Sequence, residues 1–542
     1  MNRPTRRWTA LVGLLSLLLA VAGASAPVSF ARGDTATRVA GIDVDATTIP
    51  QLEALMDAHR LSSVQLVQFY LHRIAKLNPT LHAVITVSPT ALADARAADR
   101  ARSGAHGPLL GIPVIVKDNI DTTGMPTTAG SFALAASRPP DAFIVSRLRA
   151  AGALIIGKAN LSEWANFRSN PSSSGWSGIG GQTNMAYVLD RNPCGSSSGS
   201  GVAASADLAT VTVGTETDGS IVCPSGANGD AGIKPTLGLL SRSGIVPITA
   251  DQDTAGPIAR NMTDAAVLLG ATSGVDPADA ATAAQAGHAY TNYTQFLDKD
   301  ALKGARIGIW REGSFEIEGV AVDPHVSAVM EDTIDNLEAA GATIVDPADV
   351  PIAPAYGPEF TALLCEFKSD VASYLAAHTA AGYPKTLQDL IDFNNAHRQL
   401  EGPWGSEIFD LAQATGGRAD PDCVAARAAA TSIAQAAIND TLAAQHLDAI
   451  IAPTNGPAWV TDPIKGDLGG DFSKFIGSSS PSAIAGYASV TVPAGFVGPL
   501  PVGVSFIGGR WDEPKLIALA YALEQATHVR VPPTFLPTTA FP

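Results

Sequence analysis

The sequence predicts an α/β protein, with one large domain built on a mixed, mostly parallel β-sheet that helices cover on both faces. Three observations support this fold class. Short apolar runs typical of buried strands alternate with amphipathic segments along most of the chain. No repeat of 20–50 residues is present, and no obvious linker interrupts the pattern after residue 31. We therefore expect residues 32–542 to form a single domain.

The elements expected in the first part of the chain begin with an amphipathic helix. Ser62 and Ser63 offer it an N-cap, and Asn78-Pro79 should end it. The next expected elements are, in order, a strand at 83–87, a helix at 91–103, a buried strand at 111–117, a helix at 142–151, a strand at 153–156 and a helical segment at 161–167. Residues 168–183 are rich in Gly, Ser and Pro and predict a loop that faces the substrate.

The second part of the chain continues the alternation of helices and strands. The expected elements are a helix at 201–208, strands at 210–215 and near 244–247, a helix after Thr263, a strand at 305–310, Ala-rich helices between about 326 and 445, strands at 448–453, 490–493 and 502–507, and a helix at 513–525. Turns rich in Gly and Ser precede residue 201 and follow residue 215. They can bring backbone N–H groups and hydroxyls to one point.

The first 31 residues predict a signal peptide. Arg3, Arg6 and Arg7 form a basic start, and the apolar run at 11–22 is too short to span a bilayer comfortably. An uncleaved anchor is the alternative. We expect a secreted or periplasmic protein with no stable membrane association after cleavage.

The composition argues against some classes of partner and does not decide whether the cysteines form disulfides. The net charge is −16 and the 35 basic residues form no cluster, so we expect no nucleic acid partner. Cys/His metal spacings are absent, and we expect no metal and no cofactor. Cys194 and Cys223 flank the central stretch and can bridge if its two turns meet, but they can equally stay reduced. Pairing of Cys365 with Cys423 is likewise open.

Lys117 is the first candidate for catalysis because it ends an otherwise apolar strand. Burial lowers the pKa of a lysine, and a fall of about 3 from the usual value of about 10.4 would leave a neutral amine near pH 7. A neutral amine can act as a general base. The alternative is a structural lysine paired with Asp118 or another carboxylate.

Serines in the two turns are candidate nucleophiles. Residues 195–199 (GSSSG) match the G-x-S-x-G elbow with Ser197 at its centre, but a turn rather than a strand precedes them. His446 and His528 lie in helix-like surroundings, which disfavours a Ser-His-Asp hydrolase. Ser220 closes a strand-turn segment, where its hydroxyl would lie beside free backbone N–H groups. The alternative is a serine that only closes the turn.

These residues together resemble the amidase signature family, whose pattern combines a lysine on a strand, a Gly/Ser loop and a serine nucleophile in a tight turn. The matching motifs are GIPVIVKDN (111–119), PCGSSSGS (193–200), GTETDGSIVCP (214–224), GIKPT (232–236), GKANLSEW (157–164), GQTNM (181–185), DAIIAPT (448–454) and LPVGVSFIG (500–508). The resemblance covers roughly residues 49–531 and implies the amidase signature fold.

The resemblance also implies a Ser-Ser-Lys triad. Ser220 would attack the amide carbonyl, and Ser196, held across a cis peptide bond in this family, would relay protons between Ser220 and neutral Lys117. The backbone N–H groups of Thr217, Asp218, Gly219 and Ser220 would form the oxyanion hole. Water would then hydrolyse the acyl-enzyme without a cofactor. The choice of Ser196 over Ser197 depends on alignment with the family loop.

Two departures from the family pattern indicate the substrate class. The usual Gly-Gly-Ser is Asp218-Gly219-Ser220 here, and the loop is SSSGSG rather than SSGGS. Together with SEWANFRSN (162–170) and SGW (174–176), these variants resemble the peptide amidases, which remove C-terminal amides from peptides. Arg168, Asn170, Trp176 and Asp218 are candidates for substrate binding, although the aromatic residues can equally be packed in the core.

Several functions remain open at this point. The prediction is an exported amidase that acts on a peptide or small-molecule amide and releases ammonia. The alternatives are an aryl or fatty acid amide hydrolase of the same family, a Ser-His-Asp α/β-hydrolase and a non-catalytic extracellular binding protein. A tRNA-dependent amidotransferase component is disfavoured by the export signal.

Overall fold

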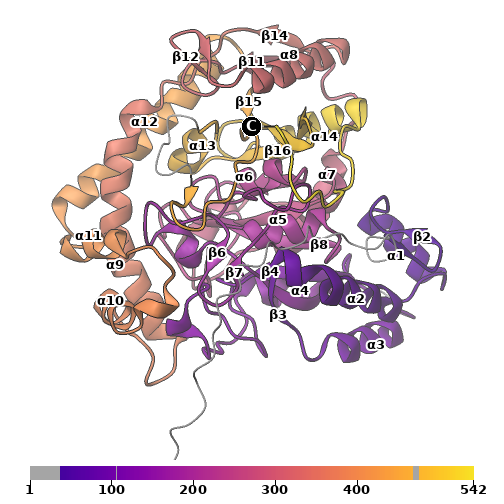
Figure 1. The fold of residues 1–542 in the computed structure, drawn as a ribbon. Helices are drawn as coiled ribbons and strands as arrows, with labels where there is room; N and C mark the ends of the chain where they lie inside the picture. The colour runs from indigo at the N-terminus through magenta and orange to yellow at the C-terminus, as the bar shows by residue number, and fades with distance from the viewer. Residues whose placement is uncertain (1–36, 105, 468–474, 542) are drawn as a thin grey trace, which may run out of the picture.

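An eleven-stranded sheet forms the centre of the computed structural model, which describes residues 37–104, 106–467 and 475–541 (Figure 1). Across the sheet the strands are β14 (Thr343–Val345), β11 (Arg306–Ile309), β15 (Ala449–Pro453), β17 (Leu500–Ile507), β16 (Ser489–Val497), β9 (Ala231–Lys234), β10 (Thr254–Ala259), β8 (Val211–Glu216), β4 (Pro113–Lys117), β5 (Leu154–Ala159) and β3 (Val84–Val87). The predicted signal peptide lies outside the described residues and stays a prediction.

The sheet is mixed, with two parallel groups connected by antiparallel strands. Strands β5, β4 and β8 are parallel neighbours, and so are β14, β11 and β15. The strands between these groups, and the edge strand β3, pair in antiparallel fashion. The parallel strand pairing expected from the sequence thus occurs within these two groups of three strands. Every residue of β4, β5 and β8 is buried, which requires cover on both faces.

Helices provide this cover and confirm the predicted fold class. Their bounds are α1 (Ile49–Asp57), α2 (Ser63–Leu81), α3 (Ala91–Ala101), α4 (Phe143–Ala150), α5 (Ser198–Ser205), α6 (Val222–Ala227), α7 (Met262–Thr272), α8 (Pro324–Ala339), α9 (Tyr356–His378), α10 (Leu387–Ala396), α11 (Glu407–Ala414), α12 (Pro421–Ala444), α13 (Ser480–Ala485) and α14 (Glu513–Thr527). Helices α5 and α6 pack on each other and on the sheet, while α7, α8 and α14 form a second packed set on it. Helices α9 to α12 form the orange group at the left of Figure 1.

Short elements complete the fold. Two-residue strands form the hairpins β1 (Arg38–Val39) with β2 (Ile42–Asp43), β6 (Trp176–Ser177) with β7 (Gly181–Gln182), and β12 (Glu316–Ile317) with β13 (Val320–Ala321). The 3-10 turns are Phe132–Leu134, Glu163–Asn166, Ala280–Gln285, Tyr293–Phe296, Ala353–Ala355 and Arg398–Leu400. Among the described helices, none has both the length and the apolar character that a membrane crossing requires.

Helix α2 corrects the predicted end at Asn78-Pro79, because it continues to Leu81. Pro79 lies in its last turn, where it lacks the N–H that would donate to the Ala75 carbonyl, so the interruption affects only the end of the helix. The chain then reverses at His82, which has a left-handed backbone and donates its N–H to the Asn78 carbonyl. The Asn78 side chain bonds both the N–H and the carbonyl of Val84, each at 2.8 Å, and so joins the helix end to β3.

Two other predicted elements also differ. Residues 244–247 form no strand beyond an isolated bridge between Ile245 and Ile120, and the sheet instead uses β10, whose Gly and Pro weaken the strand signal. The predicted helical segment at 161–167 is only the 3-10 turn Glu163–Asn166. Its residues Trp164 and Ala165 have left-handed backbones with φ of 51° and 57°, which end any helix.

Candidate active site

Two neighbouring parallel strands deliver the first site residues to one edge of the sheet. Lys117 ends β4, and Thr215 lies near the end of β8, its parallel neighbour. The Lys117 amine Nζ donates to Ser196 Oγ at 2.8 Å, to Thr215 Oγ1 at 2.9 Å and to the Thr215 carbonyl at 3.2 Å. Asp118 pairs with Lys158 at 3.4 Å. The structure therefore places Lys117 against hydroxyls and not against the carboxylate proposed as its structural partner.

The surroundings of Lys117 favour a neutral amine. The side chain is fully buried, and burial lowers its pKa to about 7, although the negative charges of Asp253 and Glu216 act in the opposite direction. The fall agrees in direction and size with the sequence-based expectation. Near pH 7 a substantial fraction of Lys117 is thus unprotonated and able to accept a proton from Ser196.

The loop before α5 distinguishes Ser196 from Ser197. The Gly195–Ser196 peptide bond is cis, and the Ser196 hydroxyl accepts from Lys117. Ser197 Oγ instead donates to the Thr215 carbonyl at 3.0 Å and accepts the Thr215 N–H at 3.1 Å. Both hydrogen bonds of the Ser197 hydroxyl thus join the start of α5 to β8. This geometry disfavours the elbow in which Ser197 is the nucleophile.

Ser220 lies in the turn between β8 and α6, on the wall of a cavity of about 360 Å³. Thr217, Asp218 and Gly219 line the same wall. Glu216 accepts the N–H groups of Ile221 and Val222 at 2.7 and 3.0 Å and so anchors the start of α6. Within the described chain, the N–H groups of residues 217–220 donate to no backbone or side-chain acceptor. They are therefore free to stabilise an oxyanion.

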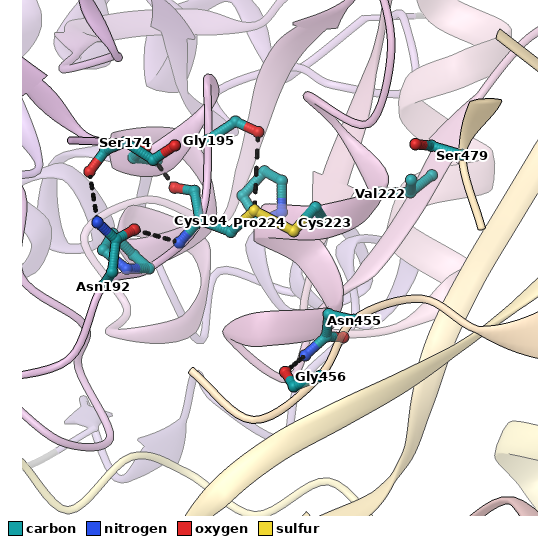
Figure 2. Close-up of a disulfide and its surroundings, with 12 residues drawn as sticks. Ser174, Asn192, Cys194, Gly195, Val222, Cys223, Pro224, Asn455, Gly456 and Ser479 are labelled. Atoms are coloured by element: carbon teal, nitrogen blue, oxygen red, sulfur yellow. Dashed lines mark hydrogen bonds between the residues drawn. A yellow bond between two sulfur atoms is a disulfide. The ribbon is translucent and has the colours of Figure 1, made fainter. Parts of the chain in front are cut away.

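A disulfide joins the two serine segments (Figure 2). Cys194 and Cys223 are bonded, and both line the cavity. The Asn192 side chain fixes the loop by accepting the Cys194 N–H at 2.9 Å. A second disulfide, Cys365–Cys423, connects α9 with α12. Both pairings that the sequence left open are thus formed.

Three of the residues predicted to bind substrate lie away from the cavity. Arg168 is buried in an ion-paired cluster, with Glu163 at 3.1 Å and Glu401 at 2.6 Å, and its guanidinium lies over the Trp176 ring. Trp176 packs edge-on against Trp404. Asn170 is exposed and donates its backbone N–H to Glu407. These contacts give Arg168 and Trp176 a structural environment, whereas Asp218 does line the cavity.

Most of the cavity wall comes from residues that sequence reasoning missed. They are Ala165, Asn166, Phe167, Ser174, Ile248, Leu363, Trp459, Asp467, Phe475, Ser479 and Ser480. They come from loops and helices far apart in the chain, and no spacing in the sequence relates them. Thr215 was also missed, because its place near Lys117 depends on the parallel pairing of β4 with β8, in which Val116 lies opposite Val213.

One group of side chains has the spacing of metal ligands, but it lies outside this cavity. Among the described residues, Glu53, Asp57 and His106 bring their ligand atoms within 4.8 Å of one another. The Arg102 guanidinium already bonds Glu53 at 2.7 Å and Asp57 at 2.9 Å. A cation in the middle of the group opposes metal binding, so its donor set does not fit a metal centre.

The chain belongs to the amidase family, whose model matches residues 65–517, and is therefore an enzyme that hydrolyses amide C–N bonds. It is 48% identical to the native peptide amidase of Stenotrophomonas maltophilia, with a TM-score of 0.84 over 90% of this chain and 99% of that one. It is also 40% identical to a protein described as a probable amidase in Arabidopsis thaliana, over 91% of this chain and 92% of the relative. An amidase family protein from Bacillus anthracis is 33% identical, with a TM-score of 0.81 over 90% of this chain and 92% of that one.

Proposed function

We propose that this amidase removes the C-terminal amide of peptides, with Ser220 as nucleophile, Ser196 as proton relay and Lys117 as base. The observation that carries this proposal is the 2.8 Å hydrogen bond between Lys117 Nζ and Ser196 Oγ, beside a cavity lined by Ser220. Ser220 is only 7% exposed, so an amide must enter the cavity to meet its hydroxyl. The same proposal makes Ser197 a structural residue.

The proton transfers follow from this arrangement. Neutral Lys117 takes the proton of Ser196, Ser196 takes that of Ser220, and Ser220 Oγ bonds to the carbonyl carbon. The N–H groups of residues 217–220 stabilise the resulting oxyanion. Ser196 then protonates the amide nitrogen, the C–N bond breaks and ammonia leaves. Water repeats the sequence on the acyl ester and releases the acid and free Ser220.

The substrate class is supported by two solved structures that are each 48% identical to this chain, a native peptide amidase and a peptide amidase in complex with the competitive inhibitor chymostatin. The apolar side chains of Phe167, Leu363 and Phe475 in the cavity suit an acyl group with apolar side chains. Export of the protein, to the periplasm or the medium, rests on the predicted signal peptide at residues 1–31.

The test measures ammonia or amine release from amidated peptides, aryl amides and fatty amides. Ser220→Ala, Lys117→Ala and Ser196→Ala should each reduce release by about 10³-fold or more with circular dichroism unchanged. Ser197→Ala should keep most of the activity and lower stability. Full activity in Ser220→Ala overturns the triad, and a preference for aryl or fatty amides overturns the peptide substrate.

A further inference from the structure

Among the described residues of the active-site cavity, the charged side chains all have the same sign. Among the described residues that line it, the ionisable groups are the carboxyls of Asp218 and Asp467, and no Lys, Arg or His is present. The remaining lining residues are apolar or carry hydroxyl, amide or disulfide groups. Among the described lining residues, a substrate therefore meets two acidic groups and no cation.

Asp218 lies two residues before Ser220 in the same turn. Ser479, which also lines the cavity, donates its hydroxyl to Asp218 Oδ1. The charges behind the turn are Glu216, Glu359 and Lys234, and Lys234 in turn faces Glu216 and Glu513. Burial raises the pKa of Asp218 and Glu216, raises that of Glu359 to about 8 and lowers that of Lys234. The net charge of this region therefore becomes more negative as the pH rises.

Asp467 reaches the cavity from a distant segment of the chain. Its carboxylate accepts the Ser174 N–H at 2.9 and 3.0 Å, the Asn192 amide at 3.1 Å and the Trp459 indole N–H at 3.3 Å. Four donor contacts from three residues fix the position of the side chain. Burial raises its pKa to about 6, so it is ionised in mildly alkaline buffer.

We propose that Asp218 and Asp467 are specificity-determining residues that admit amides with neutral or cationic neighbouring groups and repel carboxylates. This inference rests on the proposed function, since it names the substrate class of the same cavity. Like charges in a site of reduced dielectric repel one another strongly enough to change binding by about tenfold or more. Peptide amides with Asp or Glu next to the scissile amide are therefore poor substrates.

The same repulsion acts on the product. Hydrolysis of the acyl ester breaks its bond to Ser220 Oγ, transfers the water oxygen to the acyl carbon and returns one proton to Ser220. The acid formed then ionises to a carboxylate beside Asp218. A neutral amide therefore enters the site more readily than the anionic product, and the product leaves without strong inhibition.

The experiment compares kcat/KM at pH 8 for three N-acetylated tripeptide amides that differ only in a Glu, Gln or Lys at the amidated residue. We expect wild-type enzyme to disfavour the Glu peptide relative to Gln by about tenfold or more. Asp218→Asn and Asp467→Asn should each reduce this ratio by about threefold or more. Ile248→Val is the matched control, because it changes an apolar side chain of the cavity wall without removing a charge or a hydrogen-bonding group, and it should leave the ratio unchanged.

Product inhibition gives a second measurement. The deamidated Gln peptide should inhibit Asp218→Asn at a concentration about tenfold lower than wild type. If wild type releases no ammonia from any of the amides, the proposed function itself fails. If wild type is active but both variants keep the wild-type Glu/Gln ratio and inhibition constant, only the charge-selection proposal is overturned. Should Asp218→Asn not fold, the ratio in Asp467→Asn decides.

Discussion

Lys117 is kept ready for proton transfer by its burial and by the hydroxyls of Ser196 and Thr215. Since the neutral amine is the active form, activity should be lost as the pH falls through a pKa of about 7. We predict a kcat/KM profile with an acidic limb near pH 7 that drops about tenfold for each lower pH unit. A profile that stays flat down to pH 5 would contradict a lysine base.

Asp253 should set the position of this limb. Its negative charge raises the pKa of Lys117, and its carboxylate accepts the Thr217 hydroxyl at 2.6 Å and the N–H groups of Ile248 and Thr249. Asp253→Asn removes the charge and stabilises the neutral amine, so the limb should move to lower pH. Glu359→Gln is a suitable control, because Glu359 is not among the charges that act on Lys117. A limb that moves upward in Asp253→Asn would contradict this electrostatic coupling.

Thr215 is a positioning residue that sequence reasoning did not identify. Its hydroxyl accepts from Lys117 and from Asn119 at 3.0 Å, so Thr215→Val leaves two buried donors without that acceptor. We predict a loss of about 1–3 kcal/mol in the free energy of unfolding and a fall in kcat of about tenfold or more. Thr215→Ser should restore kcat, and equal losses in the Ser variant would assign the effect to packing.

The site residues that the sequence identified share one property: each lies within a continuous motif. Lys117 follows an apolar strand and Ser220 follows a strand and a turn, so their chemistry is visible in local order. Other residues of the cavity wall lie far from these motifs in the sequence and come close to them only in the folded chain. They are Trp459, Asp467 and Ser479. Arg168 was predicted to bind substrate from its local sequence, but it forms an ion pair with Glu401, a residue distant in the sequence that the local pattern does not indicate.

Among the elements, the loop before α5 and the turn before α6 work as a pair because Cys194–Cys223 joins them. Replacing both cysteines with serine opens a loop with a sequence separation of 29, which should cost about 3–4 kcal/mol of stability. Activity should also fall, since the disulfide holds the Ser196 loop against the Ser220 turn. Ammonia release and urea denaturation measure the two effects.

The second disulfide is the matched control for this prediction. Cys365–Cys423 has a sequence separation of 58 and connects α9 with α12. Its double serine variant should lose a similar amount of stability, about 4 kcal/mol, with kcat unchanged at a temperature where the variant stays folded. Equal loss of activity in both double variants would mean that the Cys194–Cys223 bond has no special role in the site.

Element prediction succeeded where the signal was local and failed where distant contacts decided. The apolar runs of β4 and β15 and the β-branched run of β8 identified strands that the sheet buries completely. Strand β10 carries Gly and Pro and is a strand because it pairs with β8 and β9. The Glu163–Asn166 turn has apolar spacing typical of a helix, but Trp164 packs on Phe409 of α11, which the local pattern does not contain.

At the scale of the whole molecule, buried carboxyls should make stability and activity respond to pH in opposite directions. Burial raises the pKa of many carboxyls in the described chain, among them Asp253, Asp264 and Asp467 to about 6 and Glu524 to about 7. A raised pKa means that the folded state binds the proton more tightly than the unfolded state. The resulting stability is complete below the unfolded pKa of about 4 and is lost as the pH rises through the folded values.

The window for this effect is therefore about pH 4 to 7. Carboxyls whose pKa is lowered, such as Asp279 beside Arg242, lose their contribution only below that window. The pKa of Lys117 is about 7 in the folded state and 10.5 ordinarily, so its contribution to the free energy of unfolding changes with pH only above this window. The carboxyls with raised pKa values, these four among them, therefore determine how the free energy of unfolding changes between pH 4 and 7.

We predict that the free energy of unfolding decreases between pH 4.5 and 7.5, while kcat/KM increases over the same range. One aspartate moved from 3.8 to about 6 accounts for about 3 kcal/mol at most. Urea denaturation at pH 4.5, 6 and 7.5 measures the slope. Asp264→Asn should flatten it, because the amide no longer titrates but can still accept the Ile49 N–H that Asp264 binds at 2.6 Å. A stability that rises with pH across this window would show that these carboxyls are ionised in the folded protein without penalty.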